Sequence, residues 1–153
     1  MAHHLHTEIE IDAAPATVWT ILTDLAGYAD WNPFITASAG KVATGERLVN
    51  RLQPPGGKAL TFKPTVTEVD EGRAFEWLGR LGLPGLFDGR HRFELVPHGD
   101  GTRLIQTESF TGMLVPILRK SLDTGTVAGF RAMNAALKAR AEAVAPGGAA
   151  STP

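Results

Sequence analysis

Four polar side chains interrupt the apolar pattern of strands that the sequence predicts: Asn50, His91, Gln106 and Glu108. A carboxylate favours the protonated form of a neighbouring imidazole whereas burial opposes it, so a His91–Glu108 pair could hold a proton near neutral pH. The pair could act as a general acid and base while Asn50 or Gln106 polarises a carbonyl. It could instead anchor the hydroxyl or carbonyl of a ligand. A third alternative is a structural pair whose members only satisfy each other.

His91 and Glu108 face each other only if the two strands form a hairpin around the turn PHGDG, residues 97–101. Counting back from the turn gives pairs that share one face of the sheet: Leu95 with Leu104, Phe93 with Gln106, and His91 with Glu108. A slip of one residue would turn Leu104 and Phe110 to solvent, which disfavours other registers. The opposite face of the same strand carries Arg90 and Arg92 and is predicted to be solvated.

Other catalytic chemistry finds little support in the sequence. The chain has no cysteine, which excludes disulfides, thiolate nucleophiles and Cys-ligated metals. His3, His4 and His6 do not make a complete set of metal ligands, and we expect a frayed polar terminus there. We therefore predict no metal and no organic cofactor.

The elements that must hold the polar residues follow from periodicity. Alternation from Leu5 to Asp12 predicts a half-buried strand. Pro15 suits the first turn of a helix that reaches about Thr23, and a second short helix would end at Pro33. Residues 35–111 then show only strand and turn signals, as in a long antiparallel meander.

The pattern after Gly112 is helical. Apolar residues recur at steps of three and four from Leu118 to Val144, which predicts a helix of about 25 residues. Gly125 and Gly129 lie inside this helix and would let it pass close to the sheet or bend around a ligand. The resulting α+β architecture is a curved antiparallel sheet of about six or seven strands wrapped around the long C-terminal helix, with two short helices after the first strand. Residues 1–144 would form one domain and 145–153 a disordered tail.

The charge balance restricts the class of partner. Lys and Arg total 15 against 16 for Asp and Glu, so no net field attracts the chain to nucleic acid. No apolar run approaches the length of a membrane span, which argues against membrane insertion. We expect a cytoplasmic protein with a small-molecule partner; its oligomeric state is left open.

Several segments resemble the SRPBCC superfamily, whose helix-grip fold is shared by START lipid-transfer domains, the birch-pollen allergen and bacterial polyketide cyclase/dehydrase-like proteins. The resemblance is carried by IEIDAAPATVWTILTDLAGYADWNPFI at the start, by DGRHRFEL, GTRL and TESFTG, and by the closing helix. It covers about residues 5–143 and implies an internal cavity between helix and sheet, open near the two short helices and the neighbouring loops.

The resemblance and the strand pattern together give a list of candidate ligand-binding residues: Trp31, Phe34, Asn50, Phe62, Trp77, Phe87, His91, Phe93, Gln106, Glu108, Phe110, Leu118 and Phe130. The rings of Trp31 and Phe34 would form a wall of the cavity or simply fill the core, because aromatic side chains dominate core packing whatever the function.

Three functions fit these observations. The first is binding or carriage of a hydrophobic small molecule such as a polyketide, a lipid or an isoprenoid-like compound. The second is a cyclase or dehydratase without metal or organic cofactor, in which His91 and Glu108 would be the catalytic acid and base. The third is a protein-interaction module that resembles superfamily members which stimulate a chaperone ATPase.

Overall fold

The computed structural model describes residues 2–144, so the predicted disordered tail lies outside the described residues. The chain begins with strand β1 (Ala2–Ile11) and continues through helix α1 (Pro15–Thr23), a single 3-10 turn and the short helix α2 (Tyr28–Trp31). Seven strands follow: β2 (Ile35–Ala39), β3 (Val49–Leu52), β4 (Leu60–Phe62), β5 (Thr65–Asp70), β6 (Ala74–Arg80), β7 (Asp88–His98) and β8 (Gly101–Thr111).

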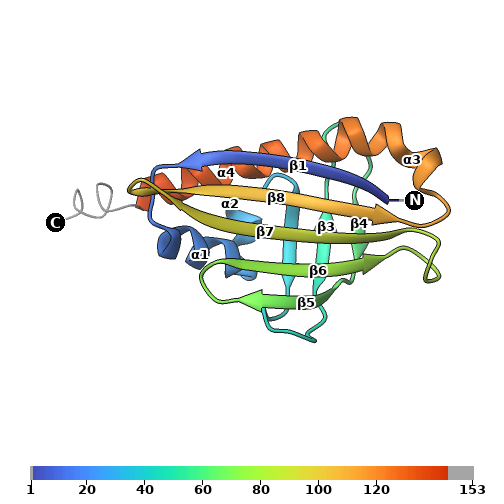
Figure 1. The fold of residues 1–153 in the computed structure, drawn as a ribbon, viewed down its shortest axis with the longest axis horizontal. Coiled ribbons are helices and arrows are strands. Elements are labelled where there is room, and N and C mark those ends of the chain that lie inside the picture. Colours follow the sequence, from blue (N-terminus) through green and yellow to red (C-terminus); the bar gives the residue numbers. More distant parts are fainter. Residues whose placement is uncertain (1, 145–153) are drawn as a thin grey trace.

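The predicted α+β architecture is confirmed, and its strands are divided between two sheets (Figure 1). Five antiparallel strands run in the order β1-β8-β7-β6-β5, and a smaller sheet has the order β2-β3-β4. The break falls at Pro64, which has no N–H to continue a ladder. The sheets stay joined there, because Leu48 N donates to Pro64 O and Val66 N donates to Glu46 O, both at 2.8 Å.

The C-terminal segment is helical from Val115 to Val144, as α3 (Val115–Ser121), one π-helical turn (Leu122–Thr126) and α4 (Val127–Val144). Figure 1 shows this helix running along the sheet, with β1 beside it. The buried face of α4 consists of Gly129, Phe130, Met133, Asn134, Leu137 and Ala141. The predicted close approach occurs at Gly129, where the Phe34 ring lies against the helix backbone. The π turn contains Gly125, so the two glycines have different surroundings.

The prediction of a frayed amino-terminal segment is wrong. Strand β1 pairs with β8 over its whole length, from Ala2 opposite Thr111 to Ile11 opposite Thr102. Nε2 of His3 also lies 2.7 Å from Oδ1 of Asp123 in the π turn. Backbone pairing with a long strand therefore orders a segment whose composition suggested disorder.

The segment between α1 and β2 closes one end of the molecule. The single tyrosine, Tyr28, is fully buried and its hydroxyl donates to Leu22 O at 2.5 Å. Burial raises the pKa of Tyr28, and Asp24 adds to the rise. The side-chain oxygen of Asn32 accepts from the backbone N–H groups of Phe34 and Ile35, each at 2.9 Å. The Asn-Pro sequence thus turns the chain from α2 into β2.

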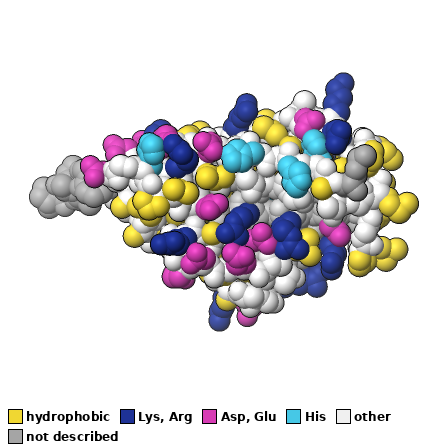
Figure 2. Space-filling view, in the orientation of Figure 1, with side chains coloured by type: hydrophobic (Ala, Val, Ile, Leu, Met, Phe, Trp, Pro, Cys, Tyr) yellow, Lys and Arg dark blue, Asp and Glu magenta, His cyan; other side chains and the backbone are white. Residues whose placement is uncertain are grey.

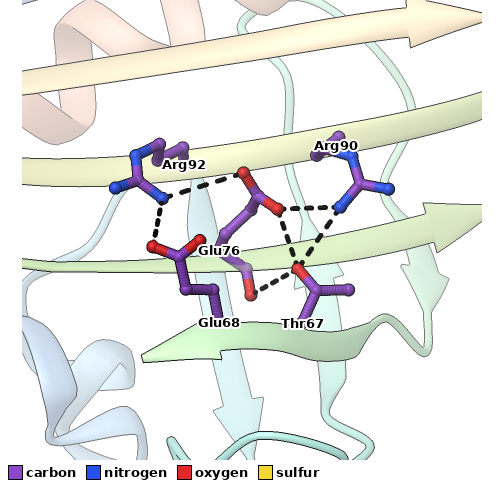
Figure 3. Close-up of polar contacts among 5 residues, drawn as sticks. All are labelled: Thr67, Glu68, Glu76, Arg90 and Arg92. Atoms are coloured by element: carbon purple, nitrogen blue, oxygen red, sulfur yellow. Dashed lines mark hydrogen bonds and ion pairs between the residues drawn. The ribbon is translucent and has the colours of Figure 1, made fainter. Parts of the chain in front are cut away.

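The outer face of the larger sheet is charged, with acidic and basic groups interspersed (Figure 2). Arg90 and Arg92 point to this face as predicted: Arg90 Nη1 lies 2.7 Å from Glu76, and Arg92 Nη1 lies 3.0 Å from Glu68 (Figure 3). Glu76, whose side chain is 15% exposed, contacts both arginines, so these charges form a network and not isolated pairs. Among residues 2–144, no helix is both long and apolar enough to cross a membrane.

Candidate functional site

A cavity of about 280 Å³ lies between the sheets and the C-terminal helix. Its wall comes from Phe34 and the start of β2, from strands β3, β4, β6, β7 and β8, from the loops after β3 and after β6, and from α3 with the π turn. It includes no residue of α1 or α2 themselves, and the part of the wall nearest to them in sequence is Phe34 and Ile35, just after α2. The apolar residues of the two short helices pack into the core: Trp19 packs edge-on against Phe75, with ring centroids 6.0 Å apart.

His91 and Glu108 face each other on the cavity wall, in the register that the hairpin predicts. Nδ1 of His91 lies 2.8 Å from Oε1 of Glu108. The imidazole is 3% exposed and stacks on the Trp77 ring, with centroids 5.0 Å apart and planes at 21°. Strand pairing and stacking therefore fix the histidine in one orientation.

The second carboxylate oxygen of Glu108 is available to a ligand. No polar group among residues 2–144 hydrogen-bonds to Oε2, and the side chain, 13% exposed, lies on the cavity wall. Gly89 leaves the space for this oxygen, because a Cβ atom at position 89 would lie 2.5 Å from it. Both ring nitrogens of His91 are occupied, so Glu108 is the group of the pair that can bond a ligand directly.

A second set of polar residues supports the pair from behind. Nε2 of His91 lies 2.8 Å from Oε1 of Gln106, and Gln106 Nε2 donates to Asn134 Oδ1 at 2.7 Å. Asn134 Nδ2 then donates to the Thr7 hydroxyl at 2.9 Å. These buried groups satisfy one another, and none of Gln106, Asn134 and Thr7 lines the cavity.

The candidate ligand-binding residues fall into two groups. Those on the cavity wall are Phe34, Phe62, Trp77, Phe87, His91, Glu108, Phe110 and Leu118. Those away from it are Trp31, Asn50, Phe93, Gln106 and Phe130. Trp31 packs against Tyr28, with centroids 5.2 Å apart, and the side-chain oxygen of Asn50 accepts from Ser38 at 2.5 Å. The alternation of side chains along each strand identified which of them face inward, but it could not separate the residues of the cavity wall from those of the packed core.

Sequence reasoning missed several polar residues near the site. Ser121 and Thr126 line the cavity from the C-terminal helix, and Arg80 lines it from the end of β6. Asn134 had a usable signal, because it lies one helical turn after Phe130 on the apolar face of α4. Within residues 2–144, no three His, Cys, Asp or Glu side chains cluster closely enough to hold a metal ion.

Comparison with solved structures places this fold among known proteins. An aromatase/cyclase from a Streptomyces species, ZhuI, superposes with a TM-score of 0.77 at 18% identity, over 94% of this chain and 96% of that one. The di-domain aromatase/cyclase BexL gives 0.76 at 16%, over 92% of this chain and 50% of that one, so this chain spans about half of its length. Norcoclaurine synthase from Thalictrum gives 0.70 at 19%, over 92% and 94%. At these identities the likeness shows the fold.

Sequence comparison gives the family. A search among curated proteins found no match. The family model described as polyketide cyclase/dehydrase and lipid transport matches residues 2–142, nearly all of the described chain. This chain therefore belongs to that family, in the polyketide cyclase-like branch of the SRPBCC superfamily.

Proposed function

We propose that this protein binds an apolar small molecule of the polyketide or aromatic kind in the cavity between its sheets and the C-terminal helix. The observation that carries the proposal is a wall made mostly of aromatic and aliphatic side chains, in which Glu108 presents an unbonded carboxylate oxygen, Oε2. The other polar side chains on the wall are those of Arg80, His91, Ser121 and Thr126. Binding sites for small molecules combine such an apolar lining with a few polar groups that fix orientation. The description of the family supports this class of ligand.

The size of the cavity restricts the ligand. About 280 Å³ lies just below the usual range for ligand pockets, roughly 300–1,000 Å³. The parallel rings of Phe87 and Phe110, 5.3 Å apart at 15°, form part of the wall. Flat aromatic surfaces favour a flat ligand of one or two fused rings, or a chain of similar volume.

Titration with the neutral dye N-phenyl-1-naphthylamine tests the proposal, alongside native mass spectrometry of the purified protein to identify co-purifying molecules. Leu118→Trp would fill the cavity from α3 and should weaken dye binding at least about tenfold. Ile117→Trp is the matched control, because Ile117 is the preceding residue and is 76% exposed. Equal dye affinity in both variants, or no dye binding by the folded wild type, would refute the proposal.

A second function, cyclisation of a polyketone, is favoured by the unbonded oxygen of Glu108 together with the aromatase/cyclase neighbours. Glu108 would remove a proton from a methylene group between two carbonyls, and the resulting enolate carbon would form a bond to a carbonyl carbon of the same chain. Returning the proton to the new alkoxide gives an alcohol. Loss of that hydroxyl with a neighbouring C–H proton releases water.

Glu108→Gln separates carriage from catalysis. If the protein is a carrier, the variant should still bind the dye, and neither the wild type nor the variant should show turnover. For a cyclase, the wild type should convert a linear polyketone thioester and the variant should lose at least about a hundredfold in kcat, because the amide cannot take the proton. Mass spectrometry detects the product as the substrate mass less one water. The wild type's failure to convert any such thioester would leave carriage as the function.

A further inference from the structure

The hydrogen bonds behind His91 run in one direction. The Thr7 hydroxyl donates to the backbone oxygen of Gln106 at 3.4 Å, so it accepts from Nδ2 of Asn134 at 2.9 Å. The other end of that amide, Oδ1, must then accept from Nε2 of Gln106, at 2.7 Å. Gln106 consequently presents its oxygen to the imidazole. Because Oε1 can only accept, Nε2 of His91 must carry a proton.

This direction determines the proton count of the His91–Glu108 pair. With Nε2 protonated, Nδ1 and Oε1 lie 2.8 Å apart and need one proton between them, since two lone pairs at that distance would repel. The proton lies either on Nδ1, which gives an imidazolium and a carboxylate, or on Oε1, which gives two neutral groups. In both cases the pair is neutral overall, which reduces the cost of burying it.

The position of that proton leaves the other carboxylate oxygen without one. In either arrangement Oε2 of Glu108 faces the cavity as an acceptor with no hydrogen of its own. A ligand with only ketone or ether oxygens would place lone pairs against lone pairs, whereas a hydroxyl group would donate. Once a bound ligand has displaced water, an acceptor left without a donor costs more than a bond gained is worth.

From these contacts we infer that Thr7, Asn134 and Gln106 are positioning residues that make the site select ligands with an O–H or N–H donor, such as phenols and enols. The inference rests on the proposed function, since it names the class of ligand that the cavity takes. Glu108 makes the contact, and the three positioning residues act through His91.

Isothermal titration calorimetry at pH 8 with 2-naphthol and 2-methoxynaphthalene tests the selection. The wild type should bind 2-naphthol at least about tenfold more tightly than the methyl ether, as expected for a hydrogen bond to a charged or strongly polarised acceptor. Similar affinities for the two compounds would overturn the inference while leaving hydrophobic binding intact. Binding of neither compound to the folded protein would instead count against the proposed function.

Glu108→Gln tests the direction of the hydrogen bonds from Thr7 to His91. If Nε2 of His91 carries the proton in the neutral ring, Nδ1 accepts from the amide NH2 of the new side chain and the amide oxygen faces the cavity. The variant should then keep a preference for 2-naphthol, reduced because the acceptor is neutral. A reversed preference, for 2-methoxynaphthalene, would mean that the NH2 group faces the ligand and that the hydrogen bonds from Thr7 to His91 run in the opposite direction.

Nitrogen-15 NMR of the labelled protein gives a readout that a purely structural role would not move. The His91 ring, assigned by loss of its signals in His91→Asn, should show a proton on Nε2. Asn134→Leu frees the Gln106 amide to turn its NH2 group toward Nε2, so a ring protonated on Nδ1 alone should appear. The proton of a neutral pair then lies on Oε2, which becomes a donor, and the preference for 2-naphthol should fall. Asn134→Asp should restore the Nε2 proton and the preference, because its carboxylate still accepts from Gln106. An unchanged ring in Asn134→Leu would show that these residues only pack.

Discussion

The ring of Phe34 occupies the space that a Cβ atom on Gly129 would need. Such an atom would lie closer than 3.0 Å to three carbons of the ring. Phe34 also packs edge-on against Phe130, with ring centroids 5.8 Å apart, and it is one of the residues that line the cavity. The residue after the Asn-Pro turn therefore sets how closely α4 approaches the cavity wall.

Alanine substitutions at two glycines of the C-terminal helix should have opposite effects on stability. Gly129→Ala should lower the free energy of unfolding by about 1–3 kcal/mol, because the methyl group overlaps a buried ring. Gly125→Ala meets nothing within 4 Å and should raise it by up to about 1 kcal/mol through helix propensity. Urea denaturation followed by circular dichroism measures both. Equal effects would mean that the helix moves freely relative to Phe34.

Gly89→Ala should displace the carboxylate of Glu108. The new methyl group would lie 2.5 Å from Oε2, so the side chain must turn away or lose its bond to His91. We expect 2-naphthol affinity to fall at least about tenfold while the fold is retained. Calorimetry measures the affinity, with Gly125→Ala as the control for a glycine that has no near neighbour. Unchanged affinity would show that Oε2 is not the contact.

Tyr28 should remain protonated in the folded protein well above its ordinary pKa near 10, because burial raises that pKa. Below about pH 10, Tyr28 is protonated in both the folded and the unfolded chain, so it does not make stability depend on pH. Between about pH 10 and the raised pKa, Tyr28 ionises only in the unfolded chain. In this range the free energy of unfolding should fall by about 1.4 kcal/mol per pH unit until the raised pKa of the folded state is reached. Absorbance at 295 nm reports this residue alone, since it is the only tyrosine. Tyrosinate absorbance near pH 10 in a folded sample would contradict the burial.

Glu142 joins the end of α4 to the residue after β1. Its Oε2 accepts from Lys138 Nζ at 2.5 Å and from Asp12 N at 2.8 Å, and these bonds lower its pKa. A lowered pKa stabilises the fold above the unfolded value and that stabilisation is lost as the pH falls through the folded value. Glu142→Gln should cost about 0.5 kcal/mol at pH 7 and nothing in strong acid. Thermal unfolding at several pH values tests this; a constant difference would exclude the ionic contribution.

The facing of His91 and Glu108 was predictable because two local signals agree. The PHGDG turn gives one register, and alternation along both strands puts apolar residues inside only in that register. The bonds from Gln106 to Asn134 and from Asn134 to Thr7 were beyond prediction, because Thr7 and Asn134 are 127 positions apart. A sequence shows that a polar residue lies on a buried face but not which distant group satisfies it.

Which inward-facing aromatic residues line the cavity was also not encoded locally. Apolar residues of α1 and α2 look the same in sequence whether they line a cavity or fill one. Trp19 and Tyr28 pack into the core because strand β6 and the α1 backbone supply partners for them. The division into two sheets had a local cause at Pro64, but a proline within a strand pattern does not reveal how far the next strand turns away.

The pairing of β1 with β8 has a consequence for how the chain acquires its structure during synthesis. Ala2 finds its partner only when Thr111 has left the ribosome, and α4, which packs beside β1, comes later still. The first strand therefore keeps unpaired backbone groups until β8 has been made, and assembly of the larger sheet waits for its last strand. We expect the sheet to form late in the synthesis of this domain, with the nascent first strand as the segment most in need of a chaperone.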